Sequence, residues 1–247
     1  MPYLATISNF SDNSGYLIAP PDSQLAITPE WFDVEYWNQQ DAIIGQSTGR
    51  NITYFFKAYE QKYVLRHYYR GGLVGKFAKD GYFYFGVQKS RVFLEFEMLL
   101  QMQQLGLPVP TPIAAKLSRH LLHYRADIIM QLIDNATDLI GTLLKRPLKA
   151  DEWQNVGKTI AKFHQNGVYH ADLNIHNIML DGDGKVWLID FDRGEFKPTD
   201  KKWQQANLKR LLRSFEKEKG KFPHLNWHMH NWHTVVHAYQ SQMSKGK

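Results

Sequence analysis

Three polar residues near the middle of the chain have the types and spacing of a phosphate-transfer site. Asn177 follows Asp172 by five residues, and Asp190 follows Asn177 by thirteen. The intervening residues 178–189 form two apolar runs separated by Asp-Gly-Asp-Gly. Apolar runs on both sides of such a turn predict a β-hairpin. The hairpin would place Asn177 and Asp190 side by side at its open end.

These residue types suit a particular chemistry. A phosphoryl group in transfer is anionic, so catalysis depends on alignment and on neutralisation by Mg²⁺. The carboxylate of Asp190 and the amide oxygen of Asn177 are hard oxygen ligands that Mg²⁺ accepts. Asp172 can orient an acceptor hydroxyl and take its proton. A polar turn before a buried strand would explain any one of these residues, but not all three at this spacing. We therefore predict a phosphotransferase site with Asp172 as base and Asn177 and Asp190 as metal ligands.

The N-terminal half contains elements that can hold a nucleotide. Residues 43–69 predict three strands, and Gly45 and Gly49 lie at the first turn. A glycine turn between strands can bring backbone N–H groups close to phosphates, although an ordinary hairpin explains the two glycines equally well. Arg66, near the end of the third strand, can bind the α- and β-phosphates with its planar guanidinium.

A helix over residues 90–104 is predicted to follow, with Ser90 at its start and Gly106 after its end. Glu95 on this helix is expected to pair with Arg66, and Glu97 is the competing candidate. A solvated surface acid is the alternative for both. Three prolines within residues 108–112 then impose an extended crossing.

The C-terminal half is predicted to be mainly helical. An amphipathic helix over residues 151–165 ends at Gly167 and leads directly into the loop that contains Asp172. Residues 197–221 are rich in Lys and Arg, with apolar residues at helical spacing, and a last helix follows. Five histidines in residues 224–237 are loosely spaced without cysteine, so we expect solvated or packed side chains rather than a metal site.

Composition limits the kinds of partner. The chain has 247 residues and a net charge of +6, which fits an anionic partner such as a nucleotide, a phosphorylated substrate or an acidic membrane. It has no cysteine, which excludes disulfides and thiolate catalysis. We see no signal peptide and no apolar run long enough to span a bilayer.

The motifs resemble those of the protein kinase-like superfamily. Residues 170–177, HADLNIHN, match H-x-D-L-x-x-x-N, and residues 189–192, IDFD, contain the Asp-Phe-Gly position. Ala171 replaces the motif's Arg, Asp192 replaces its Gly, and no Ala-Pro-Glu follows. These departures imply a small or lipid-linked acceptor and no activation-loop switch.

The resemblance implies an α+β, bilobal protein kinase-like fold. The antiparallel-sheet N-terminal lobe would comprise residues 1–133. The reduced, mainly helical C-terminal lobe would comprise residues 134–247.

Within that superfamily, residues 63–77, 106–115 and 170–196 closely resemble the Kdo (3-deoxy-D-manno-octulosonic acid) kinases of Gram-negative bacteria, in the lipopolysaccharide core sugar kinase family. Asp-Arg-Gly after Phe191 is the most discriminating local feature. The resemblance implies transfer of phosphate from ATP, with Mg²⁺, to the 4-hydroxyl of Kdo on the lipid A precursor Kdo-lipid IVA. It also implies that Arg66 with Glu95 positions the nucleotide phosphates.

The implied location is the cytoplasmic side of the inner membrane, with peripheral attachment. Basic and aromatic residues at 66–79 and 197–221 would contact the anionic membrane surface. We infer no nucleic acid and no obligate protein partner. Two alternatives are another small-molecule kinase, of the heptose or aminoglycoside type, and a non-catalytic kinase-like binding module. The intact Asp172, Asn177 and Asp190 argue against the binding module.

Overall fold

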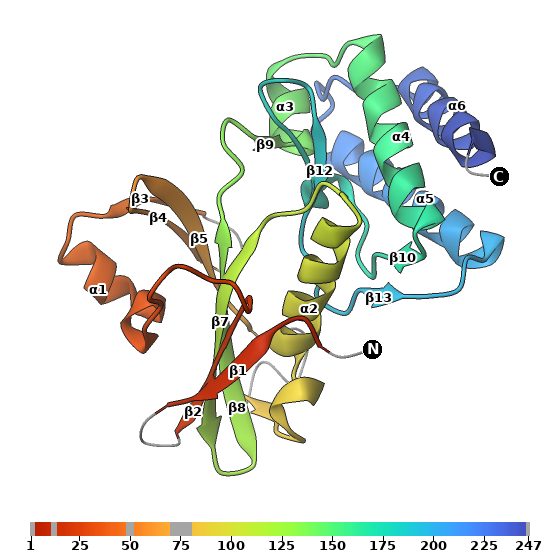
Figure 1. Cartoon of the computed structure of the whole chain (residues 1–247). Coiled ribbons are helices and arrows are strands. Elements are labelled where there is room, and N and C mark those ends of the chain that lie inside the picture. Colours follow the sequence, from red (N-terminus) through yellow and green to blue (C-terminus); the bar gives the residue numbers. More distant parts are fainter. Residues whose placement is uncertain (1–2, 11–13, 48–51, 70–80, 246–247) are drawn as a thin grey trace. The chain divides into compact units, whose positions relative to one another are not determined.

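The computed structural model describes residues 3–10, 14–47, 52–69 and 81–245 (Figure 1). The chain divides into two compact units. The first consists of Met1–Gln101 and Pro110–Leu132, and the second of Met102–Val109 and Ile133–Lys247. Strands dominate the first unit and helices dominate the second. The predicted α+β class, with an antiparallel sheet in the N-terminal part, is confirmed.

The first unit is built on an eight-stranded antiparallel sheet in the order β1-β2-β7-β8-β5-β4-β3, with β6 paired to β8. The three strands expected in residues 43–69 are present, whereas β1, β2, β6 and β7 were not predicted. The prolines before and at the start of β7 made this long strand hard to predict, although a strand tolerates proline as its first residue. The strands are β1 (Thr6–Asn9), β2 (Gly15–Ala19), β3 (Ile43–Gln46), β4 (Thr53–Ala58), β5 (Gln61–His67), β6 (Tyr82–Phe83), β7 (Pro112–His120) and β8 (His123–Gln131).

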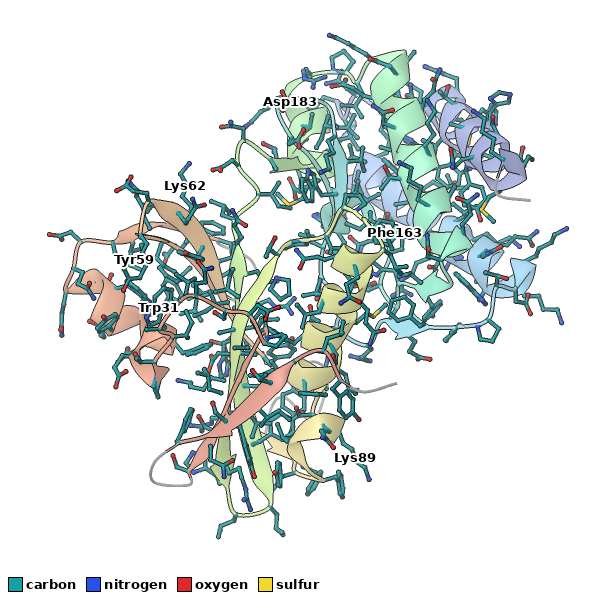
Figure 2. The ribbon with its side chains drawn as sticks, viewed as in Figure 1. Trp31, Tyr59, Lys62, Lys89, Phe163 and Asp183 are labelled. Atoms are coloured by element: carbon teal, nitrogen blue, oxygen red, sulfur yellow. The ribbon has the colours of Figure 1, made fainter. Side chains whose placement is uncertain are left out.

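An aromatic core covers one part of this sheet. Trp31, Trp37, Phe56 and Tyr63 are buried together. Residues 29–38 form two short helical segments, a 3-10 turn (Pro29–Phe32) followed by α1 (Val34–Asn38). The interruption is at Asp33, whose side chain caps α1 by accepting from Glu35 N at 2.9 Å. Figure 2 labels Trp31 and Tyr59, whose rings stack at 5.9 Å.

Helix α2 (Arg91–Gln104) agrees with the predicted helix over residues 90–104. Ser90 precedes it, and its Oγ accepts a hydrogen bond from Phe93 N. Gly106 follows the helix at a φ of 66°, the left-handed conformation that commonly ends helices. The face of α2 that includes Phe93 and Phe96 is fully buried.

The second unit contains four helices in its described part: α3 (Leu139–Lys145), α4 (Ala150–Gln165), α5 (Lys201–Lys221) and α6 (Met229–Lys245). Helices α4 and α6 pack so closely that a Cβ added at Gly157 would lie 2.2 Å from Val235 O. Two small sheets complete the unit: β12-β11-β9 (Val186–Leu188, Ile178–Leu180, Thr137–Asp138) and β10-β13 (Val168–Tyr169, Glu195–Phe196). Across the described ranges, no helix is both long enough and apolar enough to cross a membrane.

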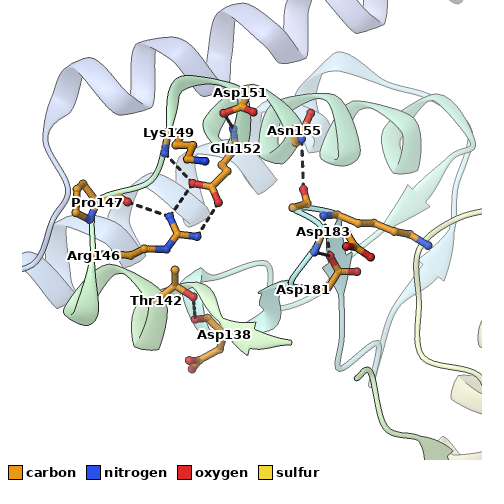
Figure 3. Close-up of polar contacts among 12 residues, drawn as sticks. Asp138, Thr142, Arg146, Pro147, Lys149, Asp151, Glu152, Asn155, Asp181 and Asp183 are labelled. Atoms are coloured by element: carbon orange, nitrogen blue, oxygen red, sulfur yellow. Dashed lines mark hydrogen bonds and ion pairs between the residues drawn. The ribbon is translucent and has the colours of Figure 1, made fainter. Parts of the chain in front are cut away.

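The corner between α3 and α4 is held by a buried acid. Both carboxylate oxygens of Glu152 accept from the Arg146 guanidinium, at 2.8 and 2.7 Å, and Lys149 N also donates to this carboxylate (Figure 3). These bonds lower the pKa of Glu152, with the Arg146 contact contributing most. The corner sets the start of α4, the helix that leads to Asp172.

Candidate active site

The loop that contains Asp172 is held by a buried histidine. Helix α4 ends before Gly167, whose φ of 71° turns the chain into β10. Asp172 N donates to His170 Nδ1 at 3.1 Å, so that nitrogen is the acceptor and Nε2 carries the proton. His170 Nε2 therefore donates to Ile189 O, 2.9 Å away. One imidazole thus joins the loop of Asp172 to the residue before Asp190.

The predicted hairpin between Asn177 and Asp190 is present. Strands β11 and β12 pair antiparallel, with Ile178 opposite Leu188. Just beyond this pair, Ile189 N donates to Asn177 O at 3.1 Å, which brings the two ends of the hairpin together. The Asn177 side-chain nitrogen donates to Asp172 O at 2.9 Å. This bond orients the amide and leaves its oxygen as an acceptor for a cation.

Several hydrogen bonds stabilise the turn of the hairpin. Asp181 Oδ1 accepts from the backbone N–H groups of Asp183 and Lys185, at 3.1 and 2.9 Å. Asn155 on α4 donates to Gly184 O at 3.3 Å (Figure 3). Gly184 has a φ of 77°, which a glycine adopts at little cost. The turn chemistry inferred from Asp-Gly-Asp-Gly is therefore confirmed.

Asp190 itself has an unusual backbone. Its φ is 62°, in the left-handed region that few residues other than glycine enter. The next residue, Phe191, is fully buried and stacks on Phe163 of α4, with ring centroids 5.7 Å apart. Its ring also lies 4.7 Å from that of His170. Burial of Phe191 therefore holds the backbone of Asp190 in this conformation.

Helix α5 contributes residues that we did not predict. Arg210 donates from Nε and Nη2 to Asp172 Oδ1, at 3.0 and 2.7 Å. Asn207 accepts from His170 N and donates to His170 O, and Ser214 Oγ accepts from Ile175 N. The three residues recur at helical spacing, so they form a polar stripe along one face of α5. That spacing is the signal in residues 197–221 that could have revealed them.

The first unit contains the predicted pair of Arg66 and Glu95. Arg66 Nη2 lies 2.6 Å from Glu95 Oε2, and the Glu95 side chain is only 1% exposed. Tyr68, which was not predicted, donates its hydroxyl to the same oxygen of Glu95. Burial, and then the charge of Glu95, raise the pKa of the Tyr68 hydroxyl. The competing residue, Glu97, instead accepts from the backbone N–H groups of Leu4 and Ala5.

The predicted phosphate-binding glycines are described only in part. Gly45 lies in β3, where a Cβ would lie 3.4 Å from the Phe55 ring. Gly49 lies outside the described residues. Residues 70–80, most of the predicted basic and aromatic patch at 66–79, also lie outside them. Within the described ranges, no three His, Asp or Glu side chains gather as a metal-binding cluster, and the rings of His228 and His230 stack on one another.

This chain is similar to known proteins over most of its length. The model of the "Lipopolysaccharide kinase (Kdo/WaaP) family" matches residues 34–239. A 3-deoxy-D-manno-octulosonic acid kinase of Vibrio vulnificus (strain CMCP6) is 43% identical over 223 residues, which cover 90% of this chain and 94% of the relative. A protein of the same name from Haemophilus influenzae (strain Rd) is 40% identical over 238 residues, covering 93% and 98%.

The predicted resemblance to Kdo kinases is thereby confirmed. The family match spans most of both units and includes Arg66, Asp172, Asn177 and Asp190. The chain therefore belongs to the lipopolysaccharide kinase (Kdo/WaaP) family and is a sugar kinase.

Proposed function

We propose that this enzyme transfers the γ-phosphate of ATP to the 4-hydroxyl of Kdo on Kdo-lipid IVA. One observation supports the proposal most strongly. The hydrogen bond from Ile189 N to Asn177 O closes the hairpin, while the Asn177 side chain bonds to Asp172 O. These two bonds support the proposal because they connect the chain segments of Asp172, Asn177 and Asp190, the proposed base and the two proposed oxygen ligands for phosphoryl transfer. The names of the relatives supply the acceptor, Kdo.

In this proposal Asp172 accepts the proton of the 4-hydroxyl. Its Oδ1 accepts from Arg210, so Oδ2 would be the oxygen that takes the proton. The hydroxyl oxygen, once aligned by this carboxylate, attacks the γ-phosphorus of ATP as its proton moves to Asp172. The bond from that phosphorus to the bridging oxygen of the β-phosphate breaks, and ADP leaves. Half-exposed surroundings suit a base that must meet a large acceptor, and the Asp172 side chain is 55% exposed.

The donor set at the hairpin suits Mg²⁺. The Asp190 carboxylate and the Asn177 amide oxygen are both hard oxygen donors, and the Asn177 nitrogen is already engaged. When bound, the ion neutralises phosphate charge during transfer. Asn177 and Asp190 would hold it, and the His170 bond to Ile189 O would keep their backbones in register.

Nucleotide binding is assigned to residues 1–133, and the base and metal ligands to residues 134–247. Arg66 would bind the α- and β-phosphates, with Glu95 and Tyr68 fixing the direction of its guanidinium. Gly45 and Gly49 would approach the phosphates through backbone N–H groups. The buried Glu95 explains why an arginine, with its planar fork, suits this position.

The acceptor implies a site of action at the cytoplasmic side of the inner membrane. Kdo-lipid IVA is an anionic lipid, and a protein of net charge +6 is attracted to an acidic leaflet. Peripheral attachment, without nucleic acid or an obligate protein partner, completes the proposal.

Asp172→Ala tests the proposal with purified protein, radiolabelled ATP and Kdo-lipid IVA. We expect kcat to fall by roughly 10²- to 10⁴-fold, the usual result of losing a general base. Nucleotide affinity and Tm should change little. Asp183→Ala, an exposed acid in the hairpin turn, is the matched control. Retention of more than about a tenth of the wild-type rate would remove Asp172 from the role of base.

A further inference from the structure

The turn between β7 and β8 has a composition that the fold does not explain. It consists of Leu121 and Leu122, with His120 opposite His123 as the last strand pair. Turns of this length favour Asn, Asp and Gly, whose side chains tolerate the required backbone. Here two leucines occupy the turn, 94% and 72% exposed. The two leucines contribute little hydrophobic stabilisation to the fold, because most of the surface of each side chain is exposed to solvent.

The backbone makes the choice of residue more telling. Leu121 has a φ of 52°, in the left-handed region that disfavours branched and bulky side chains. It is the one aliphatic residue among the non-glycine positive-φ residues of the described chain; the others are Asp41, Tyr59, Glu60, Asn135, Asp190 and Arg193. Leu121 is therefore unfavourable in this turn for two reasons, its positive φ and its exposure to solvent. This points to a role other than stabilising the fold.

Two phenylalanines extend the apolar surface of this turn. Phe83 on β6 pairs with His123 in the sheet and is 56% exposed. Phe85 is 76% exposed, and its ring lies 6.5 Å from that of Phe83. The backbone joins the two parts, because Tyr84 N donates to Leu122 O at 2.8 Å. We call Phe83, Phe85, Leu121 and Leu122 the apolar tip; it lies at the end of the sheet where the β7–β8 turn is seen in Figure 1.

The surroundings of the apolar tip are basic. Residues 81–91 and 117–126 contain Lys89, Arg91, Arg119 and Arg125 but no Asp or Glu. The next residues of the two strands, Lys116 and Asp127, form an ion pair at 3.8 Å. Lys89, labelled in Figure 2, is exposed, as are Arg119 and Arg125. The Arg119 guanidinium lies 4.6 Å from the centroid of the Tyr84 ring, which keeps this cation beside the tip. Exposed aliphatic and aromatic side chains with exposed cations beside them are complementary to an anionic lipid surface.

We propose that the apolar tip inserts into the interfacial layer of an anionic bilayer while its rim of cations binds lipid phosphates. The two leucines and Phe85 would enter the acyl boundary, and Lys89, Arg119 and Arg125 would remain at headgroup level. This inference rests on the proposed function only in that the acceptor is lipid-linked. It assigns membrane contact to a defined surface of the first unit.

The absence of cysteine permits a direct test. Leu121→Cys in the full chain provides a single site for an environment-sensitive fluorophore. Tyr59→Cys is the matched control, because Tyr59 is also exposed at a hairpin turn with positive φ, but stacks on Trp31. With vesicles containing phosphatidylglycerol, the label at position 121 should shift to the blue and become protected from an aqueous quencher. The label at position 59 should not change, and neutral vesicles should have little effect on either.

A double substitution tests the energetic contribution. Leu121→Asn with Leu122→Gly supplies the preferred residues for the turn, so Tm should stay the same or rise. Its partition coefficient on the anionic vesicles, measured by sedimentation, should fall at least about tenfold. Tyr59→Asn should partition like the wild type. Unchanged partitioning of the double variant, or an unchanged label at position 121, would overturn the inference. Concentration-dependent association of the chain that this variant abolishes, with lipid binding intact, would overturn it in favour of a second copy.

These measurements need no catalysis, so they separate the inference from the proposed function. If the wild type partitions through the apolar tip but fails to phosphorylate Kdo-lipid IVA, the proposed function is wrong and the inference stands. If it phosphorylates Kdo-lipid IVA in vesicles while the double variant partitions normally, the inference alone fails. On acceptor dispersed in detergent, the double variant should match the wild-type rate.

Discussion

The ion pair of Asp172 with Arg210 matters for geometry more than for stability. Both side chains are about half exposed, at 55% and 47%. Exposed ion pairs contribute only about 0–1 kcal/mol to folding. The Nε and Nη2 atoms of Arg210 both donate to the same oxygen, Oδ1, which restricts where this carboxylate can lie. We therefore regard Arg210 as a positioning residue for the proposed base.

Arg210→Gln is expected to lower kcat by roughly 10- to 100-fold, since a misplaced catalytic group costs rate rather than nucleotide binding. The KM for ATP and the Tm should remain close to wild type. Steady-state kinetics with Kdo-lipid IVA would check this, with Arg213→Gln, an exposed arginine on the same helix, as the control. An unchanged kcat would show that the pair is an ordinary surface contact.

The two proposed metal ligands, Asn177 and Asp190, should differ in how strongly they bind Mg²⁺. Asp190→Ala should impair activity more severely than Asn177→Ala, because a carboxylate holds Mg²⁺ more strongly than a neutral amide. In both variants the Mg²⁺ concentration for half-maximal rate should rise. Titration of activity with Mg²⁺ measures this concentration. If Asn177→Ala depended on Mg²⁺ in the same way as the wild type, Asn177 would be excluded as a ligand.

At the scale of elements, His164 links three helices of the second unit. Its Nδ1 lies 2.9 Å from the Tyr239 hydroxyl of α6, and its ring packs edge-on against Trp203 of α5, with centroids 5.0 Å apart. Burial lowers the pKa of His164 to about 4. The same burial raises the pKa of Tyr239 to about 12. Both groups are therefore neutral in the folded protein at pH 7.

Acidification should destabilise this junction. Between pH 6.5 and 4 the unfolded chain protonates His164 while the folded protein does not, so stability falls as pH falls. With a pKa of about 4 in place of the model-peptide 6.5, the loss from pH 7 to pH 5 is about 2 kcal/mol.

Denaturant unfolding at the two pH values measures this loss. The loss should be smaller by that amount in His164→Gln, which cannot titrate. His237→Gln, an exposed histidine on α6, serves as the control. Equal pH dependence of His164→Gln and wild type would contradict the assignment.

At the scale of the whole molecule, positive charge is concentrated on α5. This helix has eight Lys and Arg residues against two Glu. One of them, Arg210, faces Asp172 of the proposed site, while Lys201, Lys202 and Lys209 are exposed. Helix α5 therefore contributes both to the site and to a basic surface. Attraction to an acidic leaflet is worth roughly 1 kcal/mol for each cation close to it.

A lipid-linked acceptor should therefore be a much better substrate than the free sugar. We expect kcat/KM for Kdo-lipid IVA in anionic vesicles to exceed that for free Kdo at low salt, because binding away from the reacting hydroxyl helps to hold it in place. High salt should reduce the difference, since it screens the surface charge. Comparable values for the two acceptors would contradict attachment to a membrane surface.

The sequence by itself determined the features that depend on neighbouring residues. The hairpin between Asn177 and Asp190 follows from two apolar runs and a turn, so its register is set within fourteen residues. Helix α2 and the end of α4 follow from apolar periodicity and from the glycines after them. The pairing of Arg66 with Glu95 was predictable because each lies on a strongly patterned element.

Only the tertiary structure decided which distant residues complete the site. Arg210 is 38 positions from Asp172, and Asn207 is 37 from His170. No local rule specifies which turn of a basic helix meets a given loop, because that depends on how α5 packs. The contact of Tyr68 with Glu95 was not predicted for the same reason, because it too depends on packing. Strands β1, β2 and β7 escaped prediction because strand pairing across a sheet, rather than local propensity, stabilises them. Local sequence therefore specified the proposed base and the proposed metal ligands, whereas packing selected the side chains that hold them.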